Sequence, residues 1–463
     1  MLWSKVRGKE DMVKEIFFIG LIFTGSMGFS ANLPEIKPFQ KQEVILVLAP
    51  HPDDETVGCA GIIQKALAEG YAVYVGFFTN GDHNEVAFKL YEKKLVLNPK
   101  DYIKMGELRC KEAIAAAEVL GVPRENLIFL GYPDYGTLKI WEQHWRNAPP
   151  YRNFLTRATN VPYPENYSYR AEYKGECILN DLKSIFLKLQ PSRIFVSHPA
   201  DTNVDHRALY NFTIVALMDL EGKIPTPLVY PYLVHFGRWP YPYHYHPDLM
   251  LTPPERLANS EILWENYNLT DGQGQKKLAA LGCYKSQEVD RGYWLVSFVK
   301  RNEIFGGYRV INLTGRQPVE GGAFFSGLAE GDLSPETLSQ KSKIDRFSFH
   351  KEDNKLFLQV KFNKVLEEDV GFSIYAFGYS RKIPFPNMPK ISISFLPPDR
   401  IVLRDGRNVI FNNDLVVNRA QEEVFVEIPL WILKDPDFIF LAMESWLGEI
   451  PLDLTAWRLI EIK

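Results

Sequence analysis

The sequence predicts an α/β chain, with a Rossmann-like, doubly wound, mostly parallel sheet followed by an all-β sandwich. Three observations support this fold class. Short runs of branched apolar residues alternate with helical patterns over residues 40–302, as in repeated strand–helix units. Clusters of histidine and aspartate directly follow two of these runs. Beyond about Gly306, short strands of alternating polarity are separated by turn-rich stretches, which is typical of a β-sandwich.

The first strand is expected at residues 44–48, where an uninterrupted apolar run is typical of a strand buried on both faces. A helix at 59–69 follows it. Pro231 lies within the last predicted strand of this part and indicates an edge position there, because proline cannot donate to a sheet. The remaining predicted strands are at 72–79, 127–130, 193–197 and 228–235, and the remaining helices at 104–120, 176–189, 208–220 and 276–287.

The chain has 463 residues, too many for one ordinary core, and we expect two domains at 40–302 and 306–463. Residues 1–31 have scattered basic residues, an apolar stretch at 16–23 and then small residues, the layout of a signal peptide. Met12 is an alternative start. The apolar stretch is shorter than the roughly 20 residues of a spanning helix, so an uncleaved anchor is the less favoured alternative. The sequence therefore predicts a secreted or periplasmic protein without a stable membrane span.

Composition excludes one class of partner. The net charge is −4 and no basic run occurs, whereas proteins that bind nucleic acid usually carry a basic stripe. The sequence leaves the oligomeric state open. An insertion at 135–173 is rich in tyrosine and tryptophan. Its aromatic rings suit the faces of sugar rings, or they pack the insertion onto its own domain.

The first polar cluster, Pro50-His-Pro-Asp-Asp-Glu55, follows the strand at 44–48. His51 and Asp54 are three residues apart on an incipient helical turn, so they face the same way and can converge on one cation. Asp53 is rotated away and left free for another role. The alternative is that the two aspartates only cap the start of a helix.

The second cluster, Ser197-His-Pro-Ala-Asp-Thr-Asn-Val-Asp-His206, follows the strand at 193–197. In an open α/β sheet the carboxyl ends of the strands line one crevice, so the two clusters can converge. His51, Asp54 and His206 would then form a three-ligand site with an open position, the arrangement expected of catalytic zinc. The predicted cofactor is therefore Zn²⁺.

The paired motifs resemble the PIG-L/LmbE family of zinc-dependent N-acetylglucosamine deacetylases. The resemblance covers roughly residues 43–290, including Thr79-Asn-Gly-Asp82, Leu130-Gly-Tyr-Pro-Asp134 and Lys285-Ser-Gln287. It implies that His51, Asp54 and His206 are zinc ligands and that Asp53 is the general base. It also implies that Arg109 lies near the sugar and that Asp134 accepts hydrogen bonds from sugar hydroxyls.

One position departs from the family pattern. Many members have a histidine three residues before the last ligand, assigned as the general acid, and this chain has Asn203 there. A side-chain amide cannot act as a proton donor of that kind, so we count Asn203 with the substrate-binding residues. Asp53 could return the proton, or His235 or His198 could supply it, with His235 preferred. Asp205 is expected to orient a neighbouring imidazole.

The expected function is a zinc-dependent hydrolase that removes the N-acetyl group from an N-acetylglucosamine-type sugar or glycan outside the cytoplasm. Two alternatives remain open. One is a zinc hydrolase of another amide or ester, and the other is a glycan-binding protein with weak or no turnover. The sandwich resembles carbohydrate-binding-type domains, and we expect it to contribute to substrate capture.

Overall fold

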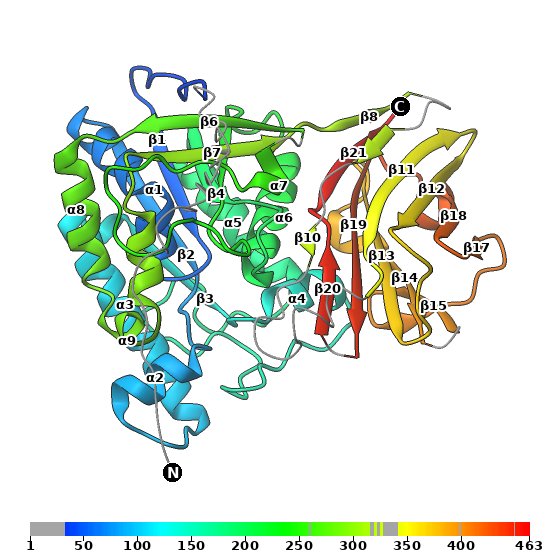
Figure 1. Cartoon of the computed structure of the whole chain (residues 1–463), viewed down its shortest axis with the longest axis horizontal. Coiled ribbons are helices and arrows are strands. Elements are labelled where there is room, and N and C mark those ends of the chain that lie inside the picture. Colours follow the sequence, from blue (N-terminus) through cyan, green and yellow to red (C-terminus); the bar gives the residue numbers. More distant parts are fainter. Residues whose placement is uncertain are drawn as a thin grey trace, which may run out of the picture. The chain divides into compact units, whose positions relative to one another are not determined.

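Five parallel strands form the central sheet of the α/β part, in the order β3-β2-β1-β4-β5 (Figure 1). The computed structural model describes residues 33–258, 261–314, 319–321, 325–326, 341–397, 400–448 and 450–463, and Leu33–Lys463 is one compact unit. β5 lies at the edge, which confirms the position that Pro231 indicates. The strands are β1 Val44–Ala49, β2 Ala72–Thr79, β3 Leu127–Tyr132, β4 Arg193–Ser197 and β5 Leu228–Tyr232.

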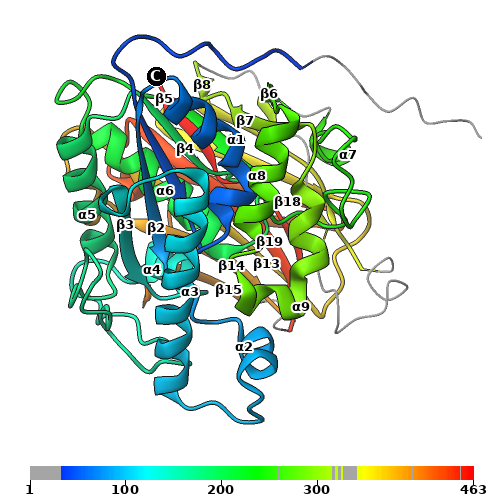
Figure 2. The same cartoon turned by 90° about the vertical axis from the view of Figure 1, so that its left-hand side faces the viewer.

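β1 is buried on both faces. Ile45 and Val47 pack into one apolar core, and Leu46 and Leu48 pack into another on the opposite side, as the alternation of side chains along a strand requires. Helices cover both faces (Figure 2). The first core contains residues of α1 Asp54–Ala68, α3 Pro99–Leu120 and α8 Asp271–Leu281, and the second contains residues of α5 Gly175–Leu189 and α6 Val204–Asp219. The doubly wound, parallel class is confirmed.

Several boundaries differ from the predicted ones. α1 begins at Asp54, inside the first polar cluster, because the carboxylates of its first turn favour a helix N-terminus. The predicted helix at 276–287 is wrong, since α8 ends at Leu281 and a separate helix follows. β5 ends at Tyr232, so His235 lies beyond the strand. The elements that were not predicted are α2 Glu85–Glu92, η1 Arg124–Asn126, α4 Thr137–Gln143, α7 Glu255–Ala258, α9 Lys285–Leu295, η2 Val296–Phe298 and the antiparallel pair β6 Ile262–Asn268 and β7 Asn302–Tyr308.

The remaining strands form two facing sheets, which confirms the predicted sandwich. One contains β10-β20-β19-β13-β14-β15-β16 with β21 and β8, and the other is β17-β18-β12-β11-β9. Inward-facing residues of both sheets, such as Leu358 and Ile374, share one apolar core. The elements are β8 Ile311–Leu313, β9 Val319–Gly321, β10 Phe325–Ser326, β11 Ile344–Glu352, β12 Lys355–Phe362, β13 Val370–Tyr379, η3 Phe385–Asn387, β14 Lys390–Leu396, β15 Arg400–Asp405, β16 Asn408–Val409, β17 Val416–Ala420, β18 Glu423–Pro429, η4 Leu430–Leu433, β19 Phe438–Leu447, β20 Ile450–Leu454 and β21 Arg458–Ile462.

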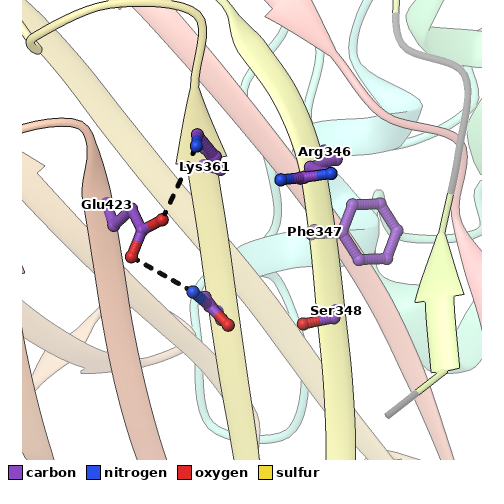
Figure 3. Close-up of a pocket in the computed structure, with 6 residues that line it drawn as sticks. Arg346, Phe347, Ser348, Lys361 and Glu423 are labelled. Atoms are coloured by element: carbon purple, nitrogen blue, oxygen red, sulfur yellow. Dashed lines mark hydrogen bonds and ion pairs between the residues drawn. The ribbon is translucent and has the colours of Figure 1, made fainter.

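The outer face of the β11–β12–β18 strands carries polar cross-strand pairs around a shallow pocket of about 160 Å³ (Figure 3). Glu423 accepts a hydrogen bond from Gln359 over 3.1 Å and lies 4.0 Å from the Lys361 ammonium. Arg346 and Ser348 lie beside them on β11. Pairs of this kind stabilise a sheet face that water reaches.

The predicted signal peptide, residues 1–31, lies outside the described residues. Within the described part of the chain, none of the helices has the length and apolar character needed to span a bilayer.

Candidate metal centre and active site

The loop after β1 makes a strained turn into α1. Asp53 precedes the helix with φ 122°, a left-handed backbone that costs a non-glycine residue on the order of 1–3 kcal/mol. The amide of His51 donates a hydrogen bond to Asp54 Oδ2 over 2.9 Å and closes the turn. Strain of this kind persists where the surroundings enforce it. Here it separates two adjacent carboxylates, Asp53 and Asp54, into different environments.

The loop after β4 is longer and is tied at several points. Ser197 at the end of the strand donates its hydroxyl to the backbone oxygen of His206 over 2.7 Å. Asn203 caps α6, where its side-chain oxygen accepts from the amide of Asp205. Asp201 accepts hydrogen bonds from the amides of Val234 and His235, so it joins this loop to the segment after β5.

β1 and β4 are the neighbours at which the strand order reverses, and ligands of open α/β sheets bind at this point. The three predicted ligands meet here. Asp54 Oδ2 lies 3.2 Å from His51 Nδ1 and 3.1 Å from His206 Nε2, and all three side chains are buried. Ligands of a tetrahedral zinc ion are about 3.3 Å apart when each bond is about 2.0 Å. These distances are compatible with three ligands of one cation.

The second nitrogen of each imidazole faces carboxylates. His206 Nδ1 lies 3.1 Å from Asp201 Oδ2, and His51 Nε2 lies 3.2 Å from Asp205 Oδ2 and 3.1 Å from Asp134 Oδ1. Carboxylates in these positions fix the tautomer and orientation of ligand histidines. The structure thus places Asp205 beside an imidazole, as predicted. The role of Asp201 beside His206 was not predicted, although Asp201 lies in the same polar cluster, five residues before His206.

The buried charges shift the pKa values of the ligands. Burial favours neutral His206, but Asp201 and Asp54 outweigh it and raise its pKa to about 9. Burial likewise opposes charge on His51, while Asp134 and the other carboxylates raise its pKa well above the usual range. The pKa of Asp54 falls well below its ordinary value, because His206 and His51 outweigh the effect of burial. Asp54 is therefore anionic and lies between the two histidines. Further carboxylates contact the other nitrogen of each ring and favour a positive charge there.

Asp53 has the opposite environment. Burial raises its pKa to about 7, with Arg109 acting against the rise and Asp54 adding to it. The Arg109 guanidinium donates to Asp53 Oδ2 over 3.0 Å, and also to the backbone oxygens of Pro52 and Gly81. Arg109 is 4 % exposed. It therefore holds the strained turn and the Asp53 carboxylate together. Arg109 also lines the pocket, and its contact with a sugar stays a prediction.

A pocket of about 360 Å³ opens above these groups. Its walls combine charged groups, aromatic rings and a few apolar side chains, a composition suited to a small polar ligand. Residues predicted as metal-binding, catalytic and substrate-binding all line it. The lining residues are His51, Asp53, His83, Asn84, Glu85, Val86, Arg109, Asp134, Tyr135, Asn203, His235, Gln287, Trp294 and Leu295.

Two predicted substrate residues are partly engaged by the protein. Asp134 contacts His51 and accepts from the amide of His83 over 2.9 Å, so its carboxylate supports the site as well as lining it. Asn203 lines the pocket while its side-chain oxygen caps α6. The amide nitrogen of Asn203 is therefore the part of this side chain left for a ligand.

The other histidines separate clearly. His235 lines the pocket, stacks on Trp294 with ring centres 5.1 Å apart, and meets His206 edge to face. Burial lowers its pKa to about 4, so it is neutral at pH 7 and would have to gain a proton before acting as an acid. His198 stacks on Trp264 and is not among the described residues that line the pocket. His83 does line it, stacked on Tyr135 with ring centres 4.6 Å apart.

Among solved structures, the chain is similar to the 4-carboxy-2-hydroxymuconate hydratase of Pseudomonas putida, at 20 % identity over 56 % of this chain and 83 % of the other, with a TM-score of 0.35. It is similar to the N,N'-diacetylchitobiose deacetylase of Pyrococcus horikoshii, at 19 % identity over 58 % and 84 %, with a TM-score of 0.34. It is also similar to a deacetylase of the teicoplanin biosynthesis pathway, at 16 % identity over 54 % and 86 %, with a TM-score of 0.33. No curated protein matches.

The family comparison is more specific. The model described as "PIG-L: GlcNAc-PI de-N-acetylase" matches residues 46–217. That range begins in β1 and ends in α6, so it contains both polar loops and all three candidate ligands. The resemblance stated from the motifs is confirmed: residues 46–217 of this chain are a PIG-L family domain.

Proposed function

We propose that this protein is a zinc-dependent hydrolase that removes the N-acetyl group from an N-acetylglucosamine-type sugar or glycan. The family match supports a hydrolytic deacetylase. One observation carries the finer proposal. Asp54 lies within 3.2 Å of a nitrogen of each ligand histidine, while adjacent Asp53 faces the pocket with a side chain 13 % exposed. A three-ligand centre with a free carboxylate beside it matches the needs of metal-assisted amide hydrolysis.

The reaction adds the oxygen of water to the acetamide carbonyl carbon and breaks the carbon–nitrogen bond, giving acetate and a free amine. Zinc, when held by His51, Asp54 and His206, would lower the pKa of a water molecule and polarise the carbonyl. Asp53 would take the proton of the attacking water, since its pKa of about 7 suits a general base at neutral pH. Arg109 keeps that carboxylate in place through its hydrogen bond.

The departing amine needs a proton, and two residues can supply it. Asp53, protonated in the first step, can return its proton to the amine nitrogen. His235 lines the same pocket, but its low pKa favours the neutral ring. We therefore propose that Asp53 serves as base and then acid, with His235 shaping the pocket wall. Asn203 would bind the substrate through its amide nitrogen.

Acetate release tests this proposal. The full-length protein is incubated with N-acetylglucosamine oligomers, with zinc and after treatment with a chelator, and O-acetylated glycans serve as the comparison. We expect zinc-dependent acetate release from the N-acetylated oligomers. Release from the O-acetylated glycans alone would replace the proposal with the esterase alternative.

One observation favours a second candidate, a glycan-binding protein with weak turnover. Asn203 stands at the position of the family's acid histidine, and a site without a dedicated acid could bind a sugar without cleaving it. Binding of N-acetylglucosamine oligomers to the zinc-loaded protein, without any acetate release, would support this candidate. Asp53 argues for turnover, because this carboxylate lines the pocket and burial raises its pKa to about 7, as a general base requires.

The proposed location, secreted or periplasmic, rests on the pattern of residues 1–31 alone. Amino-terminal sequencing of the protein from an extracytoplasmic fraction should find a start near Asn32. A protein that stays in the cytoplasm with its amino terminus uncleaved would contradict this part of the proposal.

A further inference from the structure

Two helices connect the metal centre to the sandwich. α6 begins with the candidate ligand His206 in its first turn, and its next residue is Arg207. α4 begins at Thr137, whose backbone amide donates to Asp205 Oδ1 over 3.1 Å, while the amide of Tyr135 donates to Asp205 Oδ2 over 2.6 Å. The carboxylate that supports His51 is therefore held by the start of α4.

The C-terminal half of α4 packs against the outer face of one sheet of the sandwich. Trp141 is fully buried, and its ring contacts Phe212 of α6 together with four aromatic rings that come from the sandwich. Its ring centre lies between 5.2 and 5.9 Å from those of Phe377, Phe385, Phe440 and Trp457. The apolar core on this face of the parallel sheet includes residues on the outer face of β13 and β19, such as Phe377 and Phe440. Aromatic groups packed in this way fix α4 against the sandwich.

Arg207 makes the corresponding contact for α6. Arg207 is 3 % exposed, and its guanidinium donates a hydrogen bond to the backbone oxygen of Thr455 over 2.8 Å. Burial lowers the pKa of Arg207, and the carboxylates of Glu444 on β19 and Glu142 on α4 act against that effect. Thr455 is itself fixed, because it exchanges hydrogen bonds with the backbone of Met443 on β19. Arg207, which follows His206 in the sequence, thus has its hydrogen-bond acceptor on the sandwich.

We propose that Arg207 is a positioning residue for the metal centre, and that the sandwich is a structural part of that centre. Bound to the backbone oxygen of Thr455, Arg207 fixes the first turn of α6 and with it the His206 side chain. Outer residues that orient ligands commonly change metal affinity by about 10–100-fold when they are altered. This role is distinct from substrate capture, and the inference rests on the metal centre proposed above.

The chain offers a matched control. Arg458 is also 3 % exposed and also lies at the boundary of the sandwich, but it donates to Glu261 Oε2 over 2.6 Å and lies over the ring of Tyr308. Glu261 precedes β6, far along the chain from either ligand loop. Arg458→Met should therefore lower stability without moving a metal ligand. Arg207→Met should lower stability and also displace the candidate ligand His206.

The experiment compares the two full-length variants with the unaltered protein. The zinc dissociation constant is measured by competition with a chelator, and the melting temperature is measured with and without zinc. We expect both variants to melt lower, and Arg207→Met alone to bind zinc about 10–100-fold more weakly. Equal zinc affinity in Arg207→Met and Arg458→Met would overturn the inference. If the unaltered protein binds no zinc, the proposed function itself fails.

Two milder changes keep the test decisive if Arg207→Met does not fold. Arg207→Lys keeps the charge but loses the planar group that reaches Thr455, and Glu444→Gln acts from the sandwich side alone. We expect each to weaken zinc binding by several-fold, less than Arg207→Met. Unchanged zinc affinity in both would reject a positioning role for this contact.

Discussion

The loops after β1 and β4 meet at one site but contribute to it in different ways. The β1 loop places two candidate ligands and a carboxylate outside the ligand set within four residues, and it does so with a strained backbone at Asp53. The β4 loop contributes one ligand, His206, and uses its other polar groups as supports and caps. The first loop therefore carries the reacting group, and the second fixes the geometry around it. Changes in the two loops should have correspondingly different effects.

The largest expected effect is the loss of metal from His206→Ala. Three side chains supply the candidate ligands, and removing one leaves too few to hold zinc tightly. Metal analysis should find about one zinc per chain in the unaltered protein and almost none in this variant. His198→Ala is the control from the same loop and should keep its zinc. Stoichiometric zinc in His206→Ala would remove it from the ligand set.

Zinc binding should release protons at neutral pH. In the metal-free protein His206 has a pKa of about 9, so it is protonated at pH 7, and a metal can bind only the neutral ring. The apparent affinity should therefore rise with pH until about pH 9 and then level. Calorimetry in buffers of different ionisation enthalpy measures the protons released. Binding without proton release at pH 7 would show that the ring is already neutral.

A smaller effect is expected at the β4 side of the pocket. His235→Ala should lower turnover by less than the ~10²-fold typical of a lost acid or base, since the ring is neutral at pH 7. Asn203→His should raise the rate and add a basic limb to the pH–rate profile, and Asn203→Asp, which keeps the helix cap, is its control. If the unaltered protein shows a basic limb and His235→Ala loses it together with turnover, His235 would instead be the acid.

The smallest catalytic effect should come from His198. The ring is buried against Trp264 and away from the pocket, so His198→Ala should leave turnover unchanged and cost about 1–3 kcal/mol of unfolding free energy. Denaturant unfolding and a steady-state assay measure the two quantities. A clear loss of turnover with normal stability would bring this residue back into the site.

The sequence predicted the parts of this site that depend on local pattern. Buried strands and the polar clusters after them are short-range signals, and they suggested that His51, Asp54 and His206 lie together, as the structure places them. The link from Arg207 to Thr455 joins distant segments, which no local pattern reports. Asp201 lies only five residues before His206, but the spacing alone does not show that its carboxylate turns back to the imidazole. α4 was missed because it lies inside an insertion rich in turn residues, although it supports Asp205 directly.

The two adjacent carboxylates of the β1 loop, Asp53 and Asp54, should respond to the same substitution in opposite ways. Zinc content and turnover are measured for Asp53→Asn and Asp54→Asn under the same conditions. We expect Asp53→Asn to keep its zinc and to lose ~10²–10⁴ in turnover, and we expect the acidic limb of its pH–rate profile to disappear, because the base must be ionised to act. Asp54→Asn should lose zinc and activity together. The contradictory result is an Asp53→Asn variant that loses zinc and keeps its activity per bound metal, since the two residues would then have exchanged roles.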